Sequence, residues 1–206
     1  MEEQGKTRRI VSADTTRPDR VPPGQRVIDK FPVLTQGETP HIDAEKWTFT
    51  LFGLIEKEIV LTHEQFMALP KVEVYADFHC VTTWSRLGNL WEGVAWKDIL
   101  SLVRLPDAAR HVMIHCEQGY TTNVPLADMA RDDVLFAYKH DGSDLSPEHG
   151  WPLRLIVPGL YAWKSAKWVR GVEFMEQSRP GFWEMNGYHI HGDPWNEERY
   201  GGQGSL

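Results

Sequence analysis

The chain has little cysteine, with only Cys80 and Cys116 among its 206 residues. Two cysteines in a chain of this length do not form a disulfide framework, so we expect both to be reduced thiols. No apolar run is long enough to cross a bilayer as a helix, and no membrane span is expected. The sequence also lacks the glycine patterns of a phosphate loop or a dinucleotide-binding turn, which removes the usual motifs for a nucleotide site.

Positive charge is in deficit as well. The formal net charge is −7, which disfavours nonspecific binding to nucleic acid or to an anionic membrane surface. Residues 7–11 (TRRIV) resemble the start of a twin-arginine export signal, but residues 12–18 contain no apolar segment to complete it. We therefore expect a cytoplasmic protein without a nucleic-acid partner.

Short strand patterns outnumber helical ones along the chain. Runs rich in β-branched and aromatic residues alternate with turn formers, and no regular βαβ alternation is present. The predicted strands cover residues 47–55, 59–61, 72–78, 111–116, 134–138, 153–157 and 168–174, and the predicted helices cover residues 62–70 and 97–103. This pattern indicates an α+β fold, a mixed, β-rich domain with mainly antiparallel strands.

Composition and length predict the domain organisation. Residues 1–25 are charged and contain proline, which is typical of an extended or disordered N-terminal arm. Residues 26–206 fit a single domain, because a chain of this size can bury one sizeable core. Nine tryptophans are unusual for this length. They predict either an aromatic core or a pocket for a flat, polar cofactor.

Cys80 lies in the stretch DFHCVTTWS at residues 77–85, directly after a predicted strand. A cysteine in this setting can be a buried small hydrophobe, a nucleophile or a metal ligand. A zinc site would need further ligands at close spacing, and the pair His115 and Cys116 could supply two of them. The fold would have to bring such pairs together, because their spacing does not demand it.

Cationic residues gather in two stretches of the second half of the chain. In HGWPLRLIVPG, at residues 149–159, His149 precedes Arg154, which enters an apolar strand where an unpaired arginine is rare. Residues 164–168 (KSAKW) offer two lysines, a serine hydroxyl and backbone N–H groups. They predict either a solvated loop or a cradle for a phosphate group.

Taken together, these stretches resemble the sulfite oxidase family of molybdenum–molybdopterin enzymes, from about residue 31 to the C-terminus. That family includes sulfite oxidase, plant nitrate reductase and the catalytic subunit of the bacterial protein-methionine-sulfoxide reductase. Cys80 matches the cysteine whose thiolate binds molybdenum. Tyr188, in FWEMNGY at residues 182–188, matches a tyrosine that faces the metal. The resemblance implies the molybdopterin-binding fold of the family.

The resemblance also implies a molybdenum–molybdopterin cofactor (Mo-MPT) and the residues that hold it. His149 and Arg154 match a His-Gly-x-Pro-x-Arg pair, and residues 165–167 match the segment that holds the pterin phosphate. The implied cofactor-binding residues are Thr35, Gln36, His79, Cys80, Glu117, Thr121, His149, Arg154, Ser165, Ala166 and Lys167, with Cys80 as the metal ligand. The implied catalytic residues are Cys80 and Tyr188, the tyrosine donating a hydrogen bond or proton toward the substrate.

By this resemblance the chain is an oxidoreductase that moves an oxygen atom, with two electrons, to or from a small S-oxo or N-oxo substrate. The haem and dimerisation domains of sulfite oxidases have no counterpart, so a stand-alone catalytic domain and a separate redox protein as electron donor or acceptor are implied. The substrate-binding arginine of sulfite oxidases is replaced by residues 34–36 (LTQ), which argues against tight sulfite binding. The alternatives are a non-enzymatic molybdopterin carrier and a structural zinc-binding protein.

Overall fold

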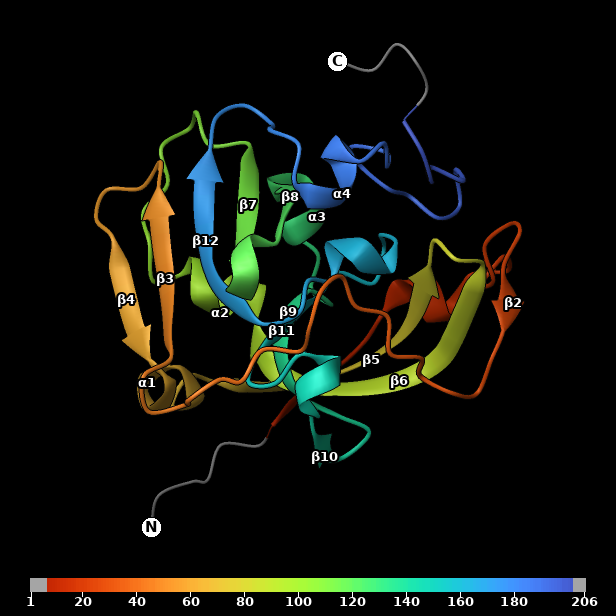
Figure 1. Cartoon of the computed structure of the whole chain (residues 1–206), viewed down its shortest axis with the longest axis horizontal. Helices are drawn as coiled ribbons and strands as arrows, with labels where there is room; N and C mark the ends of the chain where they lie inside the picture. The colour runs from red at the N-terminus through yellow and green to blue at the C-terminus, as the bar shows by residue number, and fades with distance from the viewer. Residues whose placement is uncertain (1–6, 202–206) are drawn as a thin grey trace.

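Two β-sheets form the framework of the computed structural model, which describes residues 7–201 (Figure 1). One sheet contains, in order, β1 (Arg8–Val11), β5 (Lys71–Cys80), β6 (Trp84–Ala95), β9 (Leu135–His140) and β10 (Ser143–Asp144), with β2 (Arg26–Val27) paired to β6 and β11 (Arg154–Ile156) paired to β9. The other sheet contains, in order, β4 (Ile59–Thr62), β3 (Thr48–Gly53), β12 (Val169–Met175), β7 (His111–Cys116) and β8 (Thr121–Pro125).

Helices are short, and all but the last one, which follows the last strand, lie in the connections between strands. The α-helices are α1 (His63–Met67), α2 (Trp96–Leu100), α3 (Leu126–Met129) and α4 (Phe182–Met185), and the 3₁₀ helices are η1 (Ala13–Thr16), η2 (Glu117–Gly119), η3 (Pro147–His149) and η4 (Ala162–Lys164). Among residues 7–201, no helix has the length and apolar character that a bilayer crossing requires. Only the β1–β5, β2–β6 and β3–β12 pairings are parallel within the described chain. The predicted mixed, mainly antiparallel α+β architecture is confirmed.

The predicted strands and helices appear where local sequence signals are strong. The runs of β-branched and aromatic residues form β3, β4, β5, β7, β9, β11 and β12. The start of α1 is a capping box, in which Gln65 N donates to Thr62 Oγ1 at 3.2 Å and Thr62 N donates to Gln65 Oε1 at 2.9 Å. These reciprocal bonds satisfy two N–H groups that a helix N-terminus leaves free.

The longest strand, β6, has no strand pattern in the sequence, and the sequence analysis does not predict it. It contains glycines that disfavour a regular strand, and Gly88 has a φ of 68°. A Cβ at Gly93 would lie 2.0 Å from the carbonyl oxygen of Phe136, so only glycine allows the neighbouring strand to approach there. The pairing with β9 shifts its register beside Gly93. β6 therefore depends on its partner strands β5, β9 and β2 and not on local propensity.

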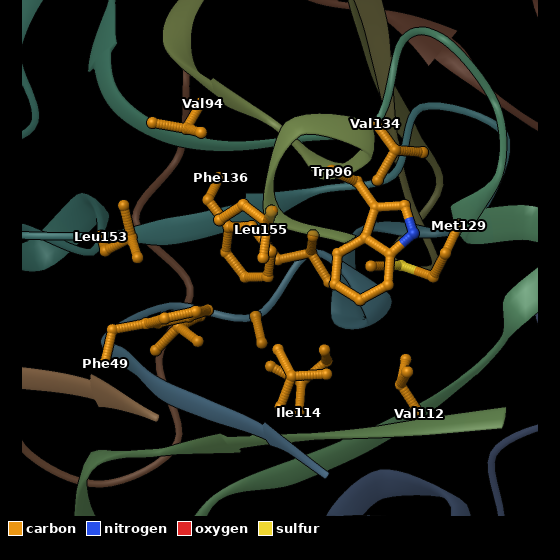
Figure 2. Packing of buried hydrophobic residues seen from close by; sticks show 14 of the residues in the cluster. Phe49, Val94, Trp96, Val112, Ile114, Met129, Val134, Phe136, Leu153 and Leu155 are labelled. Carbon is orange, nitrogen blue, oxygen red and sulfur yellow. The ribbon is translucent and has the colours of Figure 1, made fainter. Parts of the chain in front are cut away.

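An aromatic core fills the space between the two sheets (Figure 2). Phe49 of β3 and Phe136 of β9 meet with ring centroids 5.2 Å apart and an interplanar angle of 73°. Trp96, at the start of α2, is fully buried beside them. Of the two explanations for the tryptophans, the aromatic core applies to Trp96 and also to Trp47 and Trp91.

The N-terminal residues that the structure describes pack on the domain. Strand β1 runs parallel to β5, and Ser12 Oγ donates to Asp133 at 2.6 Å. Arg20 makes two bonds to Asp77, Nε to Oδ2 at 2.6 Å and Nη2 to Oδ1 at 2.7 Å. The rest of the expected arm, residues 1–6, lies outside the described residues. The described part of the arm is thus extended at β1 and shares a sheet with the domain.

The C-terminal segment is held against the same region. His191 is bonded on both ring nitrogens, Nδ1 to Glu198 at 2.8 Å and Nε2 to Asp128 at 3.1 Å. These bonds, that to Asp128 above all, raise the pKa of His191 to about 9. Trp195 Nε1 donates to the carbonyl of Asp19 at 2.8 Å, which joins the two ends of the described chain.

Replacing Asp77 by Asn should lower the free energy of unfolding by about 2 kcal/mol, the scale of a lost charge-assisted hydrogen bond. Asp77 is buried, and besides Arg20 it accepts a 2.7 Å bond from Gly88 N. The matched control is Asp132→Asn, because Asp132 pairs with Lys97 on the surface and such pairs contribute little. Chemical denaturation measures both variants. Equal losses would contradict the role given to Asp77.

The bonds of His191 should make the stability of the protein depend on pH. Because its pKa rises from 6.5 to about 9 on folding, its contribution is complete below pH 6.5 and is lost as the pH rises through about 9. The free energy of unfolding should therefore fall between these two values. His191→Gln should show a smaller fall over the same range. Parallel pH profiles for the two proteins in urea denaturation would refute this assignment.

Candidate functional site

A cavity of about 570 Å³ opens among segments that are far apart in the sequence. Its walls come from residues 31–37, the turn between β5 and β6, η2 between β7 and β8, residues 149–154, residues 162–168 and α4 with Tyr188. The predicted site residues that line it are Thr35, Gln36, Cys80, Glu117, His149, Arg154, Ser165, Ala166, Lys167 and Tyr188. Both sheets therefore contribute to a single site.

Cys80 is the last residue of β5, and its thiol lines the cavity. The sulfur lies 3.2 Å from Thr82 Oγ1. Burial raises the pKa of this thiol, and the bond to Thr82 acts in the opposite direction. Cys116 is instead part of the apolar core, so of the two cysteines only Cys80 reaches the cavity. The structure pairs neither cysteine in a disulfide.

A zinc site built from protein ligands finds no support in the described residues. No group of three or more His, Cys, Asp and Glu side chains within residues 7–201 is arranged to hold a metal ion. His115, a candidate ligand, bonds to Glu173 at 2.9 Å. Within residues 7–201, Cys80 can therefore bind a metal only together with ligands from outside this part of the chain.

Cationic groups gather on one side of the cavity. Arg154 is 4 % exposed, and its Nη1 and Nη2 donate to the backbone carbonyls of His149 and Ser165 at 3.0 and 3.1 Å. Lys167 Nζ donates to Thr35 Oγ1 at 2.5 Å. Within residues 7–201, no carboxylate forms an ion pair with Arg154 or Lys167. The described residues thus place a buried and a half-buried positive charge here without an ion-pair partner.

The pKa values of Arg154 and Lys167 are both lower than usual. Burial lowers the pKa of Arg154 to about 9, and burial together with the charge of Arg154 lowers that of Lys167 to about 8. Arg154 Nε is buried without a hydrogen-bond partner. The guanidinium lies 5.5 Å from the ring centroids of Phe31 and Trp91, so aromatic faces give it partial compensation. Both groups are still cationic at neutral pH, and an anionic ligand would stabilise their charged form.

Hydrogen-bonding groups complete this side of the cavity. Ser165 Oγ accepts a 2.9 Å bond from Val157 N, which leaves its O–H free to donate. The carboxylate of Glu117 is paired with Arg170 at 2.7 Å, so it adds little uncompensated negative charge. Ala166 has no side-chain polar group and brings its backbone to the wall. These features suit a phosphate-bearing ligand.

Aromatic side chains form the wall beside Cys80. Tyr188 stacks on Trp183 with centroids 4.8 Å apart and meets Trp163 edge-on at 5.1 Å. Burial raises the pKa of Tyr188, and the nearby Cys80 thiol adds to the rise. The phenol therefore stays protonated at neutral pH and can donate a hydrogen bond into the cavity.

A buried ion pair lies behind this aromatic wall. Lys164 and Glu184 have side chains that are 0 % and 1 % exposed, and they bond at 2.5 Å. Glu184 Oε1 also accepts from Trp163 Nε1 at 2.9 Å, and Lys164 donates to the backbone carbonyl of Asn123 at 2.9 Å. Lys164, interpreted with Lys167 as part of a phosphate cradle, points away from the cavity, so that interpretation is wrong for Lys164.

Two of the predicted binding residues do not reach the cavity. His79 precedes Cys80 on the same strand, so its side chain points to the other face. There its Nδ1 lies 2.8 Å from Ser85 Oγ, and its ring packs edge-on against Trp195. Thr121 begins β8 opposite His115 and is not part of the cavity wall.

Several wall residues escaped the sequence reasoning. The cavity wall also includes residues that are not among the predicted site residues: Phe31, Leu34, Tyr120, Trp163 and Trp183. The high tryptophan content was the available signal, and the pocket explanation of it applies to Trp163 and Trp183. Nothing in the local sequence distinguishes Phe31 or Tyr120 from core aromatics.

Replacing Lys164 by Met should lower the free energy of unfolding by about 3–5 kcal/mol, because Glu184 would keep a buried charge without its partner. The double variant Lys164→Met with Glu184→Leu removes both charges and should recover much of that loss. Thermal and urea unfolding measure the set. If the double variant is as unstable as the single one, charge burial is not the cause.

Comparison with known proteins reveals clear relatives. Residues 36–183 match the family model described as "Oxidoreductase molybdopterin binding domain". The chain is 46 % identical over 197 residues to the uncharacterized oxidoreductase YuiH of Bacillus subtilis (strain 168), which covers 95 % of this chain and 97 % of that protein. It is 28 % identical over 199 residues to a sulfite oxidase of Arabidopsis thaliana, over 79 % of this chain but only 51 % of the plant protein.

Two further similarities point in the same direction. A putative protein-methionine-sulfoxide reductase subunit, YedZ1, of Azospira oryzae is 29 % identical over 156 residues, covering 75 % of this chain and 59 % of that protein. The crystal structure of the sulfane dehydrogenase SoxCD from Paracoccus pantotrophus shares the fold, with a TM-score of 0.61 at 22 % identity over 68 % of this chain and 40 % of that chain. The chain belongs to the sulfite oxidase family of molybdopterin-binding oxidoreductases, and molybdopterin is its cofactor.

Proposed function

We propose that the chain is a molybdenum–molybdopterin enzyme that transfers an oxygen atom, with two electrons, to or from a small, neutral S-oxo or N-oxo substrate. One observation carries the proposal. A buried guanidinium without a carboxylate partner, Arg154, opens into the same cavity as the thiol of Cys80. An anionic cofactor that also needs a sulfur ligand would satisfy both groups at once.

The residues of the cavity fit this cofactor. Arg154, Lys167 and the hydroxyl of Ser165 would bind its phosphate, with His149 beside them. The Cys80 thiolate would bind molybdenum, a metal whose soft sulfur ligands in this role come from the pterin dithiolene and the protein. The bound cofactor supplies two-electron redox chemistry and an exchangeable oxygen atom. Thr35 and Gln36 would contact the pterin from residues 31–37.

The wall near Cys80 favours a neutral substrate. Tyr188, Trp163 and Trp183 carry no charge there, and residues 34–36 add none. The cations of the cavity would already be engaged by the cofactor. A sulfite or nitrate anion would therefore lack a counter-charge at this wall, whereas a sulfoxide or amine N-oxide would not need one.

Tyr188 would bind the substrate oxygen. Its phenol lies beside Cys80 and is protonated at neutral pH, since burial raises its pKa above an ordinary value that already lies well above 7. A protonated phenol can donate a hydrogen bond to an S–O or N–O oxygen and stabilise the charge that develops as the bond to oxygen breaks. A separate redox protein would provide or remove the two electrons.

The rival function is a non-enzymatic molybdopterin carrier. Such a protein would need the cationic side of the cavity but would gain nothing from Tyr188 beside a metal-binding thiol. Purification from a host that makes molybdopterin tests both, with elemental analysis for molybdenum and zinc and fluorescence of the oxidised pterin. Turnover is then assayed with a reduced dye as electron donor and dimethyl sulfoxide, trimethylamine N-oxide or nitrate as acceptor.

We expect near-stoichiometric molybdenum with pterin, and a higher kcat/KM for the neutral acceptors than for nitrate. Sulfite, assayed with an oxidised dye, should be a poor substrate. Preferred turnover of sulfite or nitrate would refute the neutral-substrate proposal. Bound cofactor with no turnover of any of them would favour the carrier, and zinc without pterin would refute both.

Replacing Cys80 by Ser should abolish turnover while the pterin still binds, because the phosphate-binding cations are unchanged. Arg154→Gln should instead lower the pterin content, since it removes the buried positive charge. Cys116→Ala is the control, because that thiol lies in the core, and it should keep both cofactor and turnover. A fully active Cys80→Ser enzyme would exclude the proposed role of this thiolate.

A further inference from the structure

Arg199 holds the turn that carries Cys80. Its Nη1 donates to the backbone carbonyl of Val81 at 2.6 Å, directly after Cys80. Its Nη2 donates to the carbonyl of Pro23 at 3.2 Å, so the guanidinium bridges the turn and the N-terminal segment. A planar guanidinium can hold two carbonyls in a defined geometry, which a lysine ammonium does less well.

The backbone of Arg199 reaches the other proposed functional residue. Its carbonyl accepts a 3.2 Å bond from the N–H of His189, the neighbour of Tyr188. The next residue, Tyr200, forms an isolated β-bridge with Tyr188, and the two rings meet edge-on at 5.4 Å. One residue thus connects the Cys80 turn, through its side chain, to the Tyr188 segment, through its main chain.

The turn itself is not fixed by regular secondary structure. It joins β5 to β6, and Thr83 within it has a φ of 70°, a conformation that a threonine rarely adopts. Gln25 Nε2 donates to the carbonyl of Cys80 at 3.0 Å and Arg26 N donates to that of Thr83 at 3.0 Å. The turn therefore depends on hydrogen bonds from distant segments. Of the three donors, Gln25, Arg26 and Arg199, it is Arg199 that also contacts the Tyr188 segment.

The charge of Arg199 has no carboxylate partner within residues 7–201, where its guanidinium forms no ion pair and lies 5.0 Å from the ring centroid of Tyr161. Arg199 is not part of the cavity wall, so it would act through the turn and not by touching the substrate.

We propose that Arg199 is a positioning residue that fixes the Cys80 sulfur relative to the Tyr188 phenol. The inference rests on the proposed function, in which Cys80 binds molybdenum and Tyr188 binds the substrate oxygen. With the tether in place, the sulfur and the phenol keep one mutual geometry toward the cofactor. Without it, the turn moves independently of the Tyr188 segment. A displacement of about 1 Å at a reacting group can reduce the rate by about 100-fold, so we expect a loss of about 10- to 100-fold.

The test compares Arg199→Gln, which removes both the positive charge and the guanidinium that donates to two carbonyls, with Arg199→Lys, which keeps only the charge. The control is Arg104→Gln, because Arg104 is an exposed arginine whose nearest carboxylate is Glu56 at 4.0 Å. The first measurement is hydrogen exchange by mass spectrometry on the cofactor-free proteins. Exchange should become faster in residues 81–84 and 187–189 of both Arg199 variants and stay unchanged in the control.

The second measurement is the electron paramagnetic resonance spectrum of the Mo(V) state, with the steady-state kinetics, in the loaded enzymes. Arg199→Gln should keep its molybdenum and pterin, shift the Mo(V) g-values and lose kcat about 10-fold or more at little-changed KM. Arg199→Lys should fall between Arg199→Gln and the unaltered enzyme. A merely structural residue would lower the unfolding temperature without moving the g-values.

Unchanged exchange in residues 81–84 and 187–189 would overturn the proposal, as would g-values equal to those of the control. The two measurements also separate this proposal from the function on which it rests. If the unaltered protein binds no molybdenum, the proposed function fails and the positioning of a metal ligand fails with it. The exchange data on the cofactor-free protein would still establish whether Arg199 tethers the two segments.

Discussion

The candidate site depends on a buried positive charge, that of Arg154, which has no carboxylate partner among residues 7–201. Arg154 is 4 % exposed, and it lies in a short strand and donates only to backbone carbonyls. Burying an unpaired ion costs several kcal/mol, which sequences rarely accept without a compensating ligand. Lys167 adds a second cation at the same wall. The positive charges at the cavity are therefore balanced only when an anion binds, and the phosphate of molybdopterin is such an anion.

The opposite wall of the cavity is built differently. Trp163 and Tyr188 are large, rigid groups, and the buried pair of Lys164 and Glu184 supports them from behind through the indole N–H of Trp163. The charges of that pair cancel within the chain, so the wall itself stays neutral. One cavity thus combines a side that requires an anion with a side that offers only aromatic faces and a phenol, which matches a charged cofactor and an uncharged substrate.

Much of the fold follows from local sequence, and the exceptions have physical causes. Strands such as β5 and β12 contain runs of β-branched and aromatic residues, and α1 begins at a capping box. Each of these elements can be predicted from its own residues. β6 cannot be predicted in this way. Its Gly93 allows β9 to approach closely, and that pairing exists only in the folded protein. Residues 1–25 have the composition of an extended or disordered arm, yet Arg20 pairs with the buried Asp77, 57 positions away.

The candidate site shows the same division. Motif resemblance points to most of the cavity residues, because the chemistry of a phosphate and a soft metal restricts the choice of side chains. It fails at His79, where strand alternation turns the neighbour of Cys80 to the opposite face. The separate interpretation of residues 164–168 as a phosphate cradle fails at Lys164, whose partner Glu184 follows 20 positions later. Long-range contacts such as Arg199 with Val81 leave no trace in local sequence.

The cations around the cavity affect how stable, and therefore how abundant, the protein is in a cell. Because they repel one another until an anion binds, cofactor binding and folding form one linked equilibrium, and a ligand at 1,000 times its Kd adds about 4 kcal/mol to stability. When molybdopterin is scarce, a larger fraction of the chains would be unfolded and open to proteases. The amount of this protein would then follow the supply of the cofactor, without any dedicated sensor.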